Sequence, residues 1–540
     1  MKHFHSLTVI LVAAFMCVTG ANAQSLSPST KWHWDEGTIV IDSPEMPNGQ
    51  KTALQLALPK MDLVRVGFVG LGMRGEPAVE RWTEIYGTQV VALCDYVAER
   101  AENCQKYLRR KNLPPASVYS GEFGYKELCE RSDIDIVYIA ADWEHHFPIA
   151  KYALEHGKNV AIEVPSAMNL EQCWALINLA ESKQLHCMIL ENCCYDWYEM
   201  TALNMAQHGV FGEVIRAAGA YIHTLDGFWD AYWKNPSEKE QLGWRLYYNR
   251  HSRGDVYATH GMGPIAQVMN IHRGDRIKTL VAMDTKSVVG KELVEKRTGQ
   301  PCDSFRNGDQ TTTLMRTENG HVLEIEHNTM TPQPYNRIHT LTGTRGYATK
   351  YPVEHYSLSK EQLKAAGIET DERISYHSFL PPKTHQALEE KYRHPILTKF
   401  SEKALEVGGH GGMDYIMDSR LVYCLQNGLP LDMDVYDLAE WCCIAELGAI
   451  SMDHNCASVA FPDFTRGHCY DLDGFRHAYA PADEEAKTEE RAKALTEAQV
   501  EATKKNDLWN LYDKAKSGNS QDVKTFEKAL KKALKMISDN

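Results

Sequence analysis

A glycine-rich segment early in the chain has the spacing of a phosphate-binding turn. Gly70, Gly72 and Gly75 form the pattern G-x-G-x-x-G, with Met73 and Arg74 before the third glycine. Because glycine lacks a side chain, the backbone of such a turn can approach a pyrophosphate closely, and the helix that follows presents its N-terminus to that group. The segment directly follows an apolar run, so we predict a dinucleotide site at a strand-to-helix turn.

A carboxylate at the end of the next apolar run indicates whether the site binds NAD or NADP. Asp95 ends the next apolar run, about 20 residues beyond Gly75, where a carboxylate holds the ribose hydroxyls of NAD. Tyr96 follows it, at a position where an NADP site more often carries arginine or serine. The sequence therefore predicts NAD as the cofactor. The alternative is a packing turn in an α/β domain that binds no ligand.

Alternating strands and helices must position these residues. Apolar runs predict strands at 64–69, 89–93, 134–140, 159–163 and 186–190. Predicted helices, such as 148–156, lie between strands, which is typical of a doubly wound parallel sheet of the Rossmann type. Ligands of such sheets bind at the carboxyl ends of the strands. The side chains there are further candidates for cofactor binding: Trp143, Glu144, His145 and His146 in one predicted loop, then Glu163, Val164 and Asn192.

The spacing of histidines and cysteines does not indicate a metal site. We expect neighbouring side chains on a loop to point apart and no third ligand to stand near the pair His145–His146. The adjacent cysteines 193–194 and 442–443 lack the C-x-x-C spacing of zinc and redox sites. We therefore expect no metal, and we expect the scattered cysteines to be mainly buried apolar side chains.

A different pattern begins after Asn192. A helix is predicted at 196–207, and strands are predicted at 214–222, 277–283, 310–316, 321–327 and 337–342. Most of these strands follow one another without helices between them, so a second, α+β domain with a large, mostly antiparallel open sheet is expected. Two loops between the strands, at 244–245 and 254–261, are rich in Tyr, Trp, Arg and His. Such residues recognise the ring and hydroxyls of a sugar, although a polar surface loop explains the composition equally well.

Charge and the N-terminal segment limit the partners and the compartment. Of the 540 residues, 58 are Lys or Arg and 72 are Asp or Glu, which gives a net charge of −14. Such a surface repels phosphate backbones, so we expect no nucleic acid partner, and a neutral small molecule or glycan suits it better. Lys2 and His3, an apolar run at 7–18 and the exit A-N-A at 21–23 predict a secretory signal peptide. We expect an exported protein, periplasmic or secreted, without a membrane anchor.

These patterns divide the chain into five parts. They are a signal peptide at 1–23, an N-terminal segment at 24–62, an NAD-binding Rossmann domain at 63–192, a substrate-binding sheet domain at 193–473 and a charged helical extension at 474–540. The extension is rich in Ala, Glu and Lys with helical spacing of its leucines. We interpret it as a solvated helical appendage. A contact between copies of the chain in a homo-oligomer is the alternative.

Several segments resemble one enzyme family. The motifs are E-N-C-C-Y-D at 191–196, G-A-Y-I-H at 219–223, G-D-V-Y-A-T-H-G-M-G-P at 254–264 and G-G-H-G-G-M-D-Y at 408–415. They resemble glycoside hydrolase family 109, which contains NAD-dependent α-N-acetylgalactosaminidases within the glucose–fructose oxidoreductase/inositol dehydrogenase superfamily. Val164 stands where that superfamily often has a catalytic lysine, which agrees with the hydrolase branch.

The resemblance implies a reaction and a set of roles. It implies hydrolysis of N-acetylgalactosaminides, most often α-linked, by oxidation at C3 with bound NAD, loss of the C2 proton, elimination, water addition and re-reduction. Tyr221 then matches the base at C2, His260 the histidine near the C3 hydroxyl, and Tyr257 a residue that touches sugar and nicotinamide. Further substrate-contacting positions match Arg245, Ala258, Thr259 and Tyr335, and His410 matches a residue that lines the site. The alternative is an NAD-dependent sugar oxidoreductase without net hydrolysis.

Overall fold

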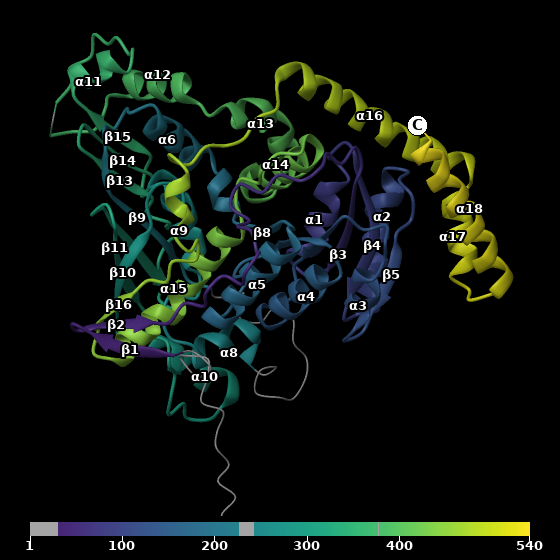
Figure 1. Cartoon of the computed structure of the whole chain (residues 1–540), viewed down its shortest axis with the longest axis horizontal. Coiled ribbons are helices and arrows are strands. Elements are labelled where there is room, and N and C mark those ends of the chain that lie inside the picture. The colour runs from purple at the N-terminus through teal and green to yellow at the C-terminus, as the bar shows by residue number, and fades with distance from the viewer. Residues whose placement is uncertain (1–30, 226–241, 376, 540) are drawn as a thin grey trace, which may run out of the picture.

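Two β-sheets organise the chain and lie next to each other in Figure 1. The computed structural model describes residues 31–225, 242–375 and 377–539, so the predicted signal peptide lies outside the described residues. One sheet has six strands and the other has ten. The predicted combination of a Rossmann sheet and a large, mostly antiparallel sheet is confirmed.

The six-stranded sheet is parallel throughout, in the order β5-β4-β3-β6-β7-β8. Its strands are β3 (Val64–Val69), β4 (Thr88–Asp95), β5 (Ser117–Ser120), β6 (Ile136–Ile139), β7 (Asn159–Ile162) and β8 (Cys187–Ile189). Every residue of β4 is buried, as expected for a strand covered on both faces. The chain runs outward from β3 to β5 and returns to β6, so the order reverses between β3 and β6. Open α/β sheets bind their ligands at that point.

Helices connect these strands: α1 (Gly75–Trp82), α2 (Ala98–Arg110), α3 (Gly124–Cys129), α4 (Trp143–Glu155) and α5 (Leu170–Lys183). One prediction is wrong here, because residues 143–146 form the first turn of α4 and not a loop. The carboxylate of Asp142 caps this turn by accepting a hydrogen bond from the backbone N–H of His145. The prediction began the helix at Pro148, but Pro148 lies inside α4.

The ten-stranded sheet has the order β1-β2-β16-β10-β11-β12-β9-β13-β14-β15. Its strands are β1 (Trp32–Asp35), β2 (Thr38–Ile41), β9 (Val214–Ile222), β10 (Ile277–Asp284), β11 (Thr311–Thr317), β12 (Val322–Asn328), β13 (Thr340–Gly343), β14 (Gly346–Thr349), β15 (His355–Leu358) and β16 (Ser458–Ala460). Most pairs are antiparallel, whereas β9 pairs with β12 and β2 with β16 in parallel. The strand predicted at 337–342 begins only at Thr340, because Ile338 and His339 have positive φ angles.

Helices pack against this sheet and between the two halves of the chain. They are α6 (Trp197–Gln207), α8 (Trp244–His251), α9 (Ala258–Val268), α10 (Val289–Thr298), α11 (Lys360–Ala365), α12 (Pro382–Tyr392), α13 (Pro395–Val407), α14 (Met413–Asn427) and α15 (Val435–Asp453). Residues 244–245 and 258–261, which were predicted to lie in loops, are therefore helical. The glycines that suggested a loop are a packing contact instead: a Cβ on Gly219 of β9 would lie 2.2 Å from the carbonyl oxygen of Gly261.

The C-terminal extension consists of α16 (Ala482–Lys505), α17 (Leu508–Ala515) and α18 (Ser520–Ser538), seen at the right of Figure 1. It is attached to the Rossmann half by specific hydrogen bonds. Gln499 donates to the backbone carbonyl of Thr88 at 2.9 Å, and the Trp509 indole donates to that of Leu113 at 3.1 Å. Whether this extension contacts a second copy of the chain stays a prediction. Within the described ranges, none of the helices combines the length and the apolar character that a membrane span needs.

Candidate active site

The three glycines of the first motif play three different parts. Gly70 has a φ of +87°, and a Cβ there would lie 2.4 Å from the backbone nitrogen of Ala141. A Cβ on Gly75 would lie 1.8 Å from the carbonyl oxygen of Gly70, so this glycine allows α1 to pack against the turn. A Cβ on Gly72 would meet no protein atom within 4 Å. Gly72 lines a cleft, so the space beside it suits a group that approaches the backbone from outside, as a pyrophosphate does.

This cleft runs along the carboxyl ends of the parallel strands and has a volume of about 600 Å³, which is typical of a small-molecule site. Asp95 lines it, and its carboxylate accepts hydrogen bonds from the backbone N–H groups of Leu71 at 2.7 Å and Val97 at 2.8 Å. The carboxylate therefore holds the glycine turn against the end of β4. Gly70, Met73 and Val164 line the same cleft. The shape of the turn and the position of Asp95 fit a dinucleotide.

A buried charge network closes one side of the cleft. Arg74 forms ion pairs with Glu163 at 2.9 Å and with Asp414 at 3.1 Å. Asp414 also accepts a hydrogen bond from the Asn192 amide at 2.6 Å and pairs with His410 at 2.8 Å. Burial would raise the pKa of Asp414, but the charges of Arg74 and Arg81 and the hydrogen bond with His410 together outweigh it and lower the pKa well below its usual value. Asp414, which the sequence analysis did not single out, thus joins the motif at 408–415 to the glycine turn.

Three of the four side chains in the first turn of α4 line the cleft, and the fourth does not. Trp143, His145 and His146 line the cleft, whereas Glu144 accepts a hydrogen bond from the Tyr248 hydroxyl at 3.2 Å. His146 is buried, and its two ring nitrogens lie 2.8 and 2.9 Å from backbone carbonyl oxygens. The Trp143 ring stands edge-on to that of Tyr257, with centroids 5.0 Å apart. Trp143 therefore connects the cleft with the sheet domain.

The three residues predicted to be catalytic lie together. The ring of Tyr221, on β9, stacks on that of Tyr257 with centroids 4.6 Å apart, and its centroid lies 4.9 Å from that of His260 on α9. The Arg245 side chain donates a hydrogen bond to the Tyr257 hydroxyl at 2.8 Å, and Arg245 also lines the cleft. Tyr335 is the most exposed member, at 45%, with its ring edge-on to Tyr221. We call these five residues the aromatic cluster.

Two predicted substrate positions and one predicted cofactor position are buried. Ala258 and Thr259 are both buried at the start of α9, and neither is among the residues that line the cleft. Asn192 is also buried, with its amide nitrogen bound to Asp414. The roles predicted for these residues stay predictions.

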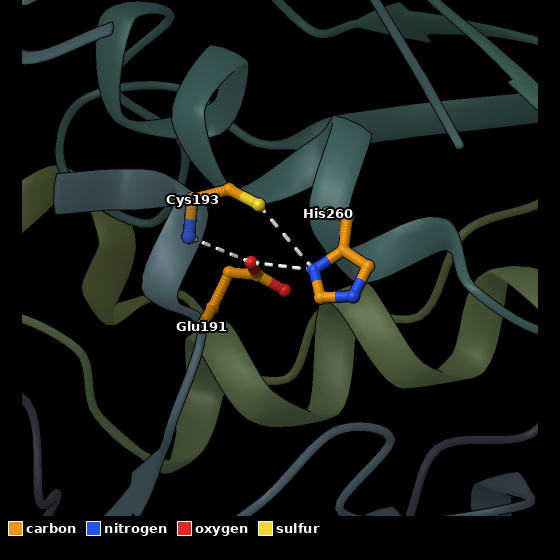
Figure 2. Close-up of side chains that lie close together, drawn as sticks. All are labelled: Glu191, Cys193 and His260. Atoms are coloured by element: carbon orange, nitrogen blue, oxygen red, sulfur yellow. Dashed lines mark hydrogen bonds and ion pairs between the residues drawn. The ribbon is translucent and has the colours of Figure 1, made fainter. Parts of the chain in front are cut away.

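His260 is oriented by a carboxylate that the sequence analysis did not assign to the site. Its Nδ1 lies 2.8 Å from Glu191 Oε1 and 3.5 Å from the sulfur of Cys193, as Figure 2 shows. Burial would raise the pKa of Glu191, but its hydrogen bonds with His260, Thr259 and the Cys193 backbone, and the positive charge of His260 when that ring is protonated, outweigh this effect and lower that pKa. The ionised carboxylate accepts the Nδ1–H, which leaves the other ring nitrogen with its lone pair. Glu191 lies two residues beyond β8, the last parallel strand, and that position is the signal that could have revealed it.

Further buried polar atoms around the aromatic cluster lack hydrogen-bond partners in the described chain. One oxygen of Asp255 accepts a hydrogen bond from the Tyr257 backbone N–H at 3.1 Å, whereas its second oxygen has no partner. Burial raises the pKa of Asp255 to about 8. His223 likewise directs Nδ1 to the carbonyl oxygen of Thr224 and leaves Nε2 without a partner. Such unpaired groups are costly to bury and are suited to bind an incoming polar ligand.

The cleft and the parallel sheet define the first half as an NAD-binding domain of the oxidoreductase type. Residues 64–190 match the family model described as "Oxidoreductase family, NAD-binding Rossmann fold", which confirms the predicted cofactor. Among solved structures, an NAD-binding oxidoreductase from Klebsiella pneumoniae aligns with a TM-score of 0.55 and 16% identity over 74% of this chain and 100% of that one. Levoglucosan dehydrogenase in complex with NADH and levoglucosan gives a TM-score of 0.53 and 18% identity over 74% and 99%. Both show the shared fold.

The chain belongs to glycosyl hydrolase family 109. Residues 195–471 match the model "Glycosyl hydrolase 109, C-terminal domain". Glycosyl hydrolase family 109 protein 5 of Phocaeicola vulgatus is 66% identical over 92% of this chain and 96% of that protein. Family 109 protein 1 of Bacteroides thetaiotaomicron is 54% identical over 89% of this chain and 100% of that protein. Family and fold together define an NAD-dependent glycosidase.

Proposed function

We propose that this enzyme hydrolyses α-linked N-acetylgalactosaminides by an elimination mechanism in which the cofactor ends as it began. The observation that carries the proposal is the aromatic cluster, which contacts the cofactor cleft through Arg245 and Trp143. When bound in the cleft, NAD would supply the transient oxidation of the sugar at C3 and its reversal. The protein must then bind the sugar and move protons at C3 and C2.

His260 is the group that takes the proton of the C3 hydroxyl. Its Nδ1–H is held by the ionised, fully buried Glu191, so the lone pair of Nε2 is free to accept that proton. The charge of Glu191 also stabilises the imidazolium that results. A neutral histidine held in one tautomer by a carboxylate is an effective general base near neutral pH.

Tyr221 is the group that takes the proton at C2. Burial and the neighbouring Tyr257 raise the pKa of Tyr221, while the positive charge of Arg245 acts against them. The resting side chain is thus a neutral phenol, and it must lose its proton before it can act as a base. A ketone at C3 acidifies the C2 proton, so the phenolate is needed only at that stage of the cycle.

The available carboxylates support elimination over direct displacement. Displacement glycosidases use two carboxyl groups on either side of the scissile bond. In the described part of this site, Glu191 is bound to His260, and Asp255 has one oxygen on a backbone N–H and a raised pKa. Neither is placed as a free nucleophile beside the aromatic cluster.

The test is hydrolysis of an aryl α-N-acetylgalactosaminide by purified protein without an added electron acceptor. In heavy water, elimination puts deuterium at C2 of the released sugar, and borohydride added during turnover inactivates the enzyme by reducing its NAD. Release of the aryl group without deuterium at C2 would indicate displacement. Stoichiometric reduction of added NAD without release of the aryl group would identify an oxidoreductase.

We also propose that the protein works outside the cytoplasm. The basic start, short apolar run and A-N-A exit of residues 1–23 support cleavage before Gln24. Sequencing the N-terminus of protein from the periplasmic fraction tests this proposal. A mature chain that still begins at Met1 in the cytoplasmic fraction would contradict it.

A further inference from the structure

Three side chains that can bind metals meet on the protein side of the His260 imidazole. The ligand atoms of Glu191, Cys193 and His260 all lie within 4.8 Å of one another. Figure 2 shows the carboxylate and the sulfur directed at the same ring nitrogen, Nδ1. The sequence could not show this cluster, because Cys193 and His260 are 67 residues apart and come from different elements.

The spacing suits a tetrahedral ion. Zinc binds sulfur at about 2.3 Å and imidazole nitrogen at about 2.0 Å, so tetrahedral geometry separates the two ligand atoms by roughly 3.5 Å. The Cys193 sulfur and His260 Nδ1 are already 3.5 Å apart. Glu191 Oε1 lies 2.8 Å from the same nitrogen, so its carboxylate need move only a few tenths of an ångström to make room for an ion.

Burial and the charge of Glu191 favour a cation at this place, whereas the Arg337 guanidinium beside the Cys193 thiol acts against it. The Glu191 side chain is fully buried, and its second oxygen, Oε2, has no hydrogen-bond partner of normal geometry. An ionised carboxylate with an unpaired oxygen in the interior gains from a nearby positive charge. The His260 side chain retains 14% exposure, whereas Glu191 and Cys193 are fully buried, so an ion would enter the cluster from the side of the imidazole.

We propose that Glu191, Cys193 and His260 form an inhibitory site for Zn²⁺ or a similar thiophilic divalent ion. A thiolate, an imidazole and a carboxylate are the ligand types that zinc selects. The effect on turnover rests on the function proposed above, whereas binding itself does not.

The chemistry of binding explains the inhibition. In the metal-free protein the ring proton is on Nδ1 and faces Glu191. An ion on Nδ1 displaces that proton, which moves to Nε2 through solvent, so the lone pair that accepts the substrate proton is lost. The thiol of Cys193 must also ionise, and its proton leaves to the buffer. Each bound ion therefore releases one net proton and reduces kcat.

Spectroscopic titration of the full chain without a polyhistidine tag tests the site. We expect Co²⁺, added to protein freed of metals with EDTA, to give a thiolate-to-cobalt charge-transfer band that Zn²⁺ abolishes. Calorimetry in buffers of different ionisation enthalpy should give one proton per Zn²⁺. The expectation that no third ligand stands near His145 is wrong, because ligand atoms of Asp142, Glu144 and His145 lie within 4.8 Å of one another at the surface. That cluster contains no sulfur, so it cannot give this band.

Cys193→Ser should remove the band and weaken Zn²⁺ binding about 100-fold or more. Cys194→Ser is the matched control: Cys194 is equally buried in the same short 3₁₀ helix, but its sulfur faces Gly263 of α9. This control should bind Zn²⁺ as the parent does. Both variants are compared with the parent in melting temperature and NAD content.

A Co²⁺ complex of the parent protein without a thiolate band, or a band that persists in Cys193→Ser, would overturn the proposal. So would Zn²⁺ affinity that falls equally in both serine variants. If metal-free protein hydrolyses the aryl glycoside but neither binds Zn²⁺ nor is inhibited by it, the metal site is refuted and the proposed function is not. If the protein binds Co²⁺ through Cys193 but releases no aryl group, the proposed function is refuted and the metal site is not.

Discussion

The cofactor cleft and the aromatic cluster are adjacent, but they differ in whether their polar side chains have partners within the protein. In the cleft, charged side chains are already satisfied by the protein: Arg74 is paired with Glu163 and Asp414, and Asp95 holds two backbone N–H groups. In and around the aromatic cluster, buried atoms of Asp255 and His223 lack partners in the described chain.

This difference separates the region that binds the cofactor from the region that carries out the reaction on the substrate. A cleft whose charges are mutually paired is rigid before the cofactor arrives, so little ordering is needed to bind it and release is slow. Unpaired buried groups cost stability, and they are tolerated where a substrate or a moving proton will use them. The predictions below test this division, beginning with the largest effect.

Replacement of Tyr221 by phenylalanine should affect the reaction and leave the cleft intact. The ring stack on Tyr257 survives, but the phenolic oxygen is lost, so we expect kcat to fall about 10³-fold. Deuterium exchange at C2 should disappear while the NAD content stays that of the parent. Tyr347→Phe, on β14 of the same sheet, is the control and should be fully active. Full exchange in Tyr221→Phe would mean that another residue is the base.

Glu191→Gln should remove the charge that supports His260 as a base. The glutamine oxygen can still accept the Cys193 backbone N–H and the His260 Nδ1–H, but the neutral amide no longer stabilises the imidazolium that forms when the ring accepts a proton. We expect kcat to fall about 100-fold, with a smaller change in KM. Because both residues act as one unit, the double variant Glu191→Gln/His260→Ala should be no slower than His260→Ala alone. Additive losses would show that Glu191 acts independently.

Two alanine substitutions in the glycine turn should separate cofactor binding from folding. A Cβ on Gly72 meets no protein atom, so Gly72→Ala should keep the melting temperature of the cofactor-free protein but weaken NAD retention about tenfold or more. A Cβ on Gly75 would overlap the Gly70 carbonyl, so Gly75→Ala should lower that melting temperature. NAD released into the supernatant on denaturation is the measurement. Normal NAD retention in Gly72→Ala would mean that the pyrophosphate does not pass beside Gly72.

Asp255→Asn tests the cost of an unpaired buried carboxyl. The pKa of Asp255 is about 8 in the folded protein, against about 3.9 in an unfolded chain. Between these values the folded state binds more protons, so stability falls as the pH rises from about 4 to 8. Asparagine keeps the acceptor for the Tyr257 N–H and cannot ionise. We expect its melting temperature to exceed that of the parent at pH 9, by about 1 °C for each kcal/mol regained in a chain of 540 residues, and to approach it at pH 4. An equal difference at both pH values would contradict the assignment.

Much of the cofactor half could be predicted from the sequence. The strand at 64–69, the glycine turn and Asp95 lie close together in the chain, and parallel strands bring their carboxyl ends to one edge of a sheet by rule. Local signals therefore sufficed to place Gly70, Asp95 and Glu163 at one cleft. The error there concerns the start of α4, because the Asp142 carboxylate caps a helix that begins at Trp143 and not at Pro148.

Only the tertiary structure decided how the aromatic cluster is assembled. Tyr221 comes from a strand, His260 and Arg245 come from two helices, and Glu191 follows a strand of the other sheet. No periodicity connects these segments, because the contact of α9 with β9 depends on the close approach of Gly219 and Gly261. Residue types and motifs determined which side chains carry the chemistry. Packing determined which nitrogen of His260 faces a carboxylate and a thiol, and which one is left for the substrate.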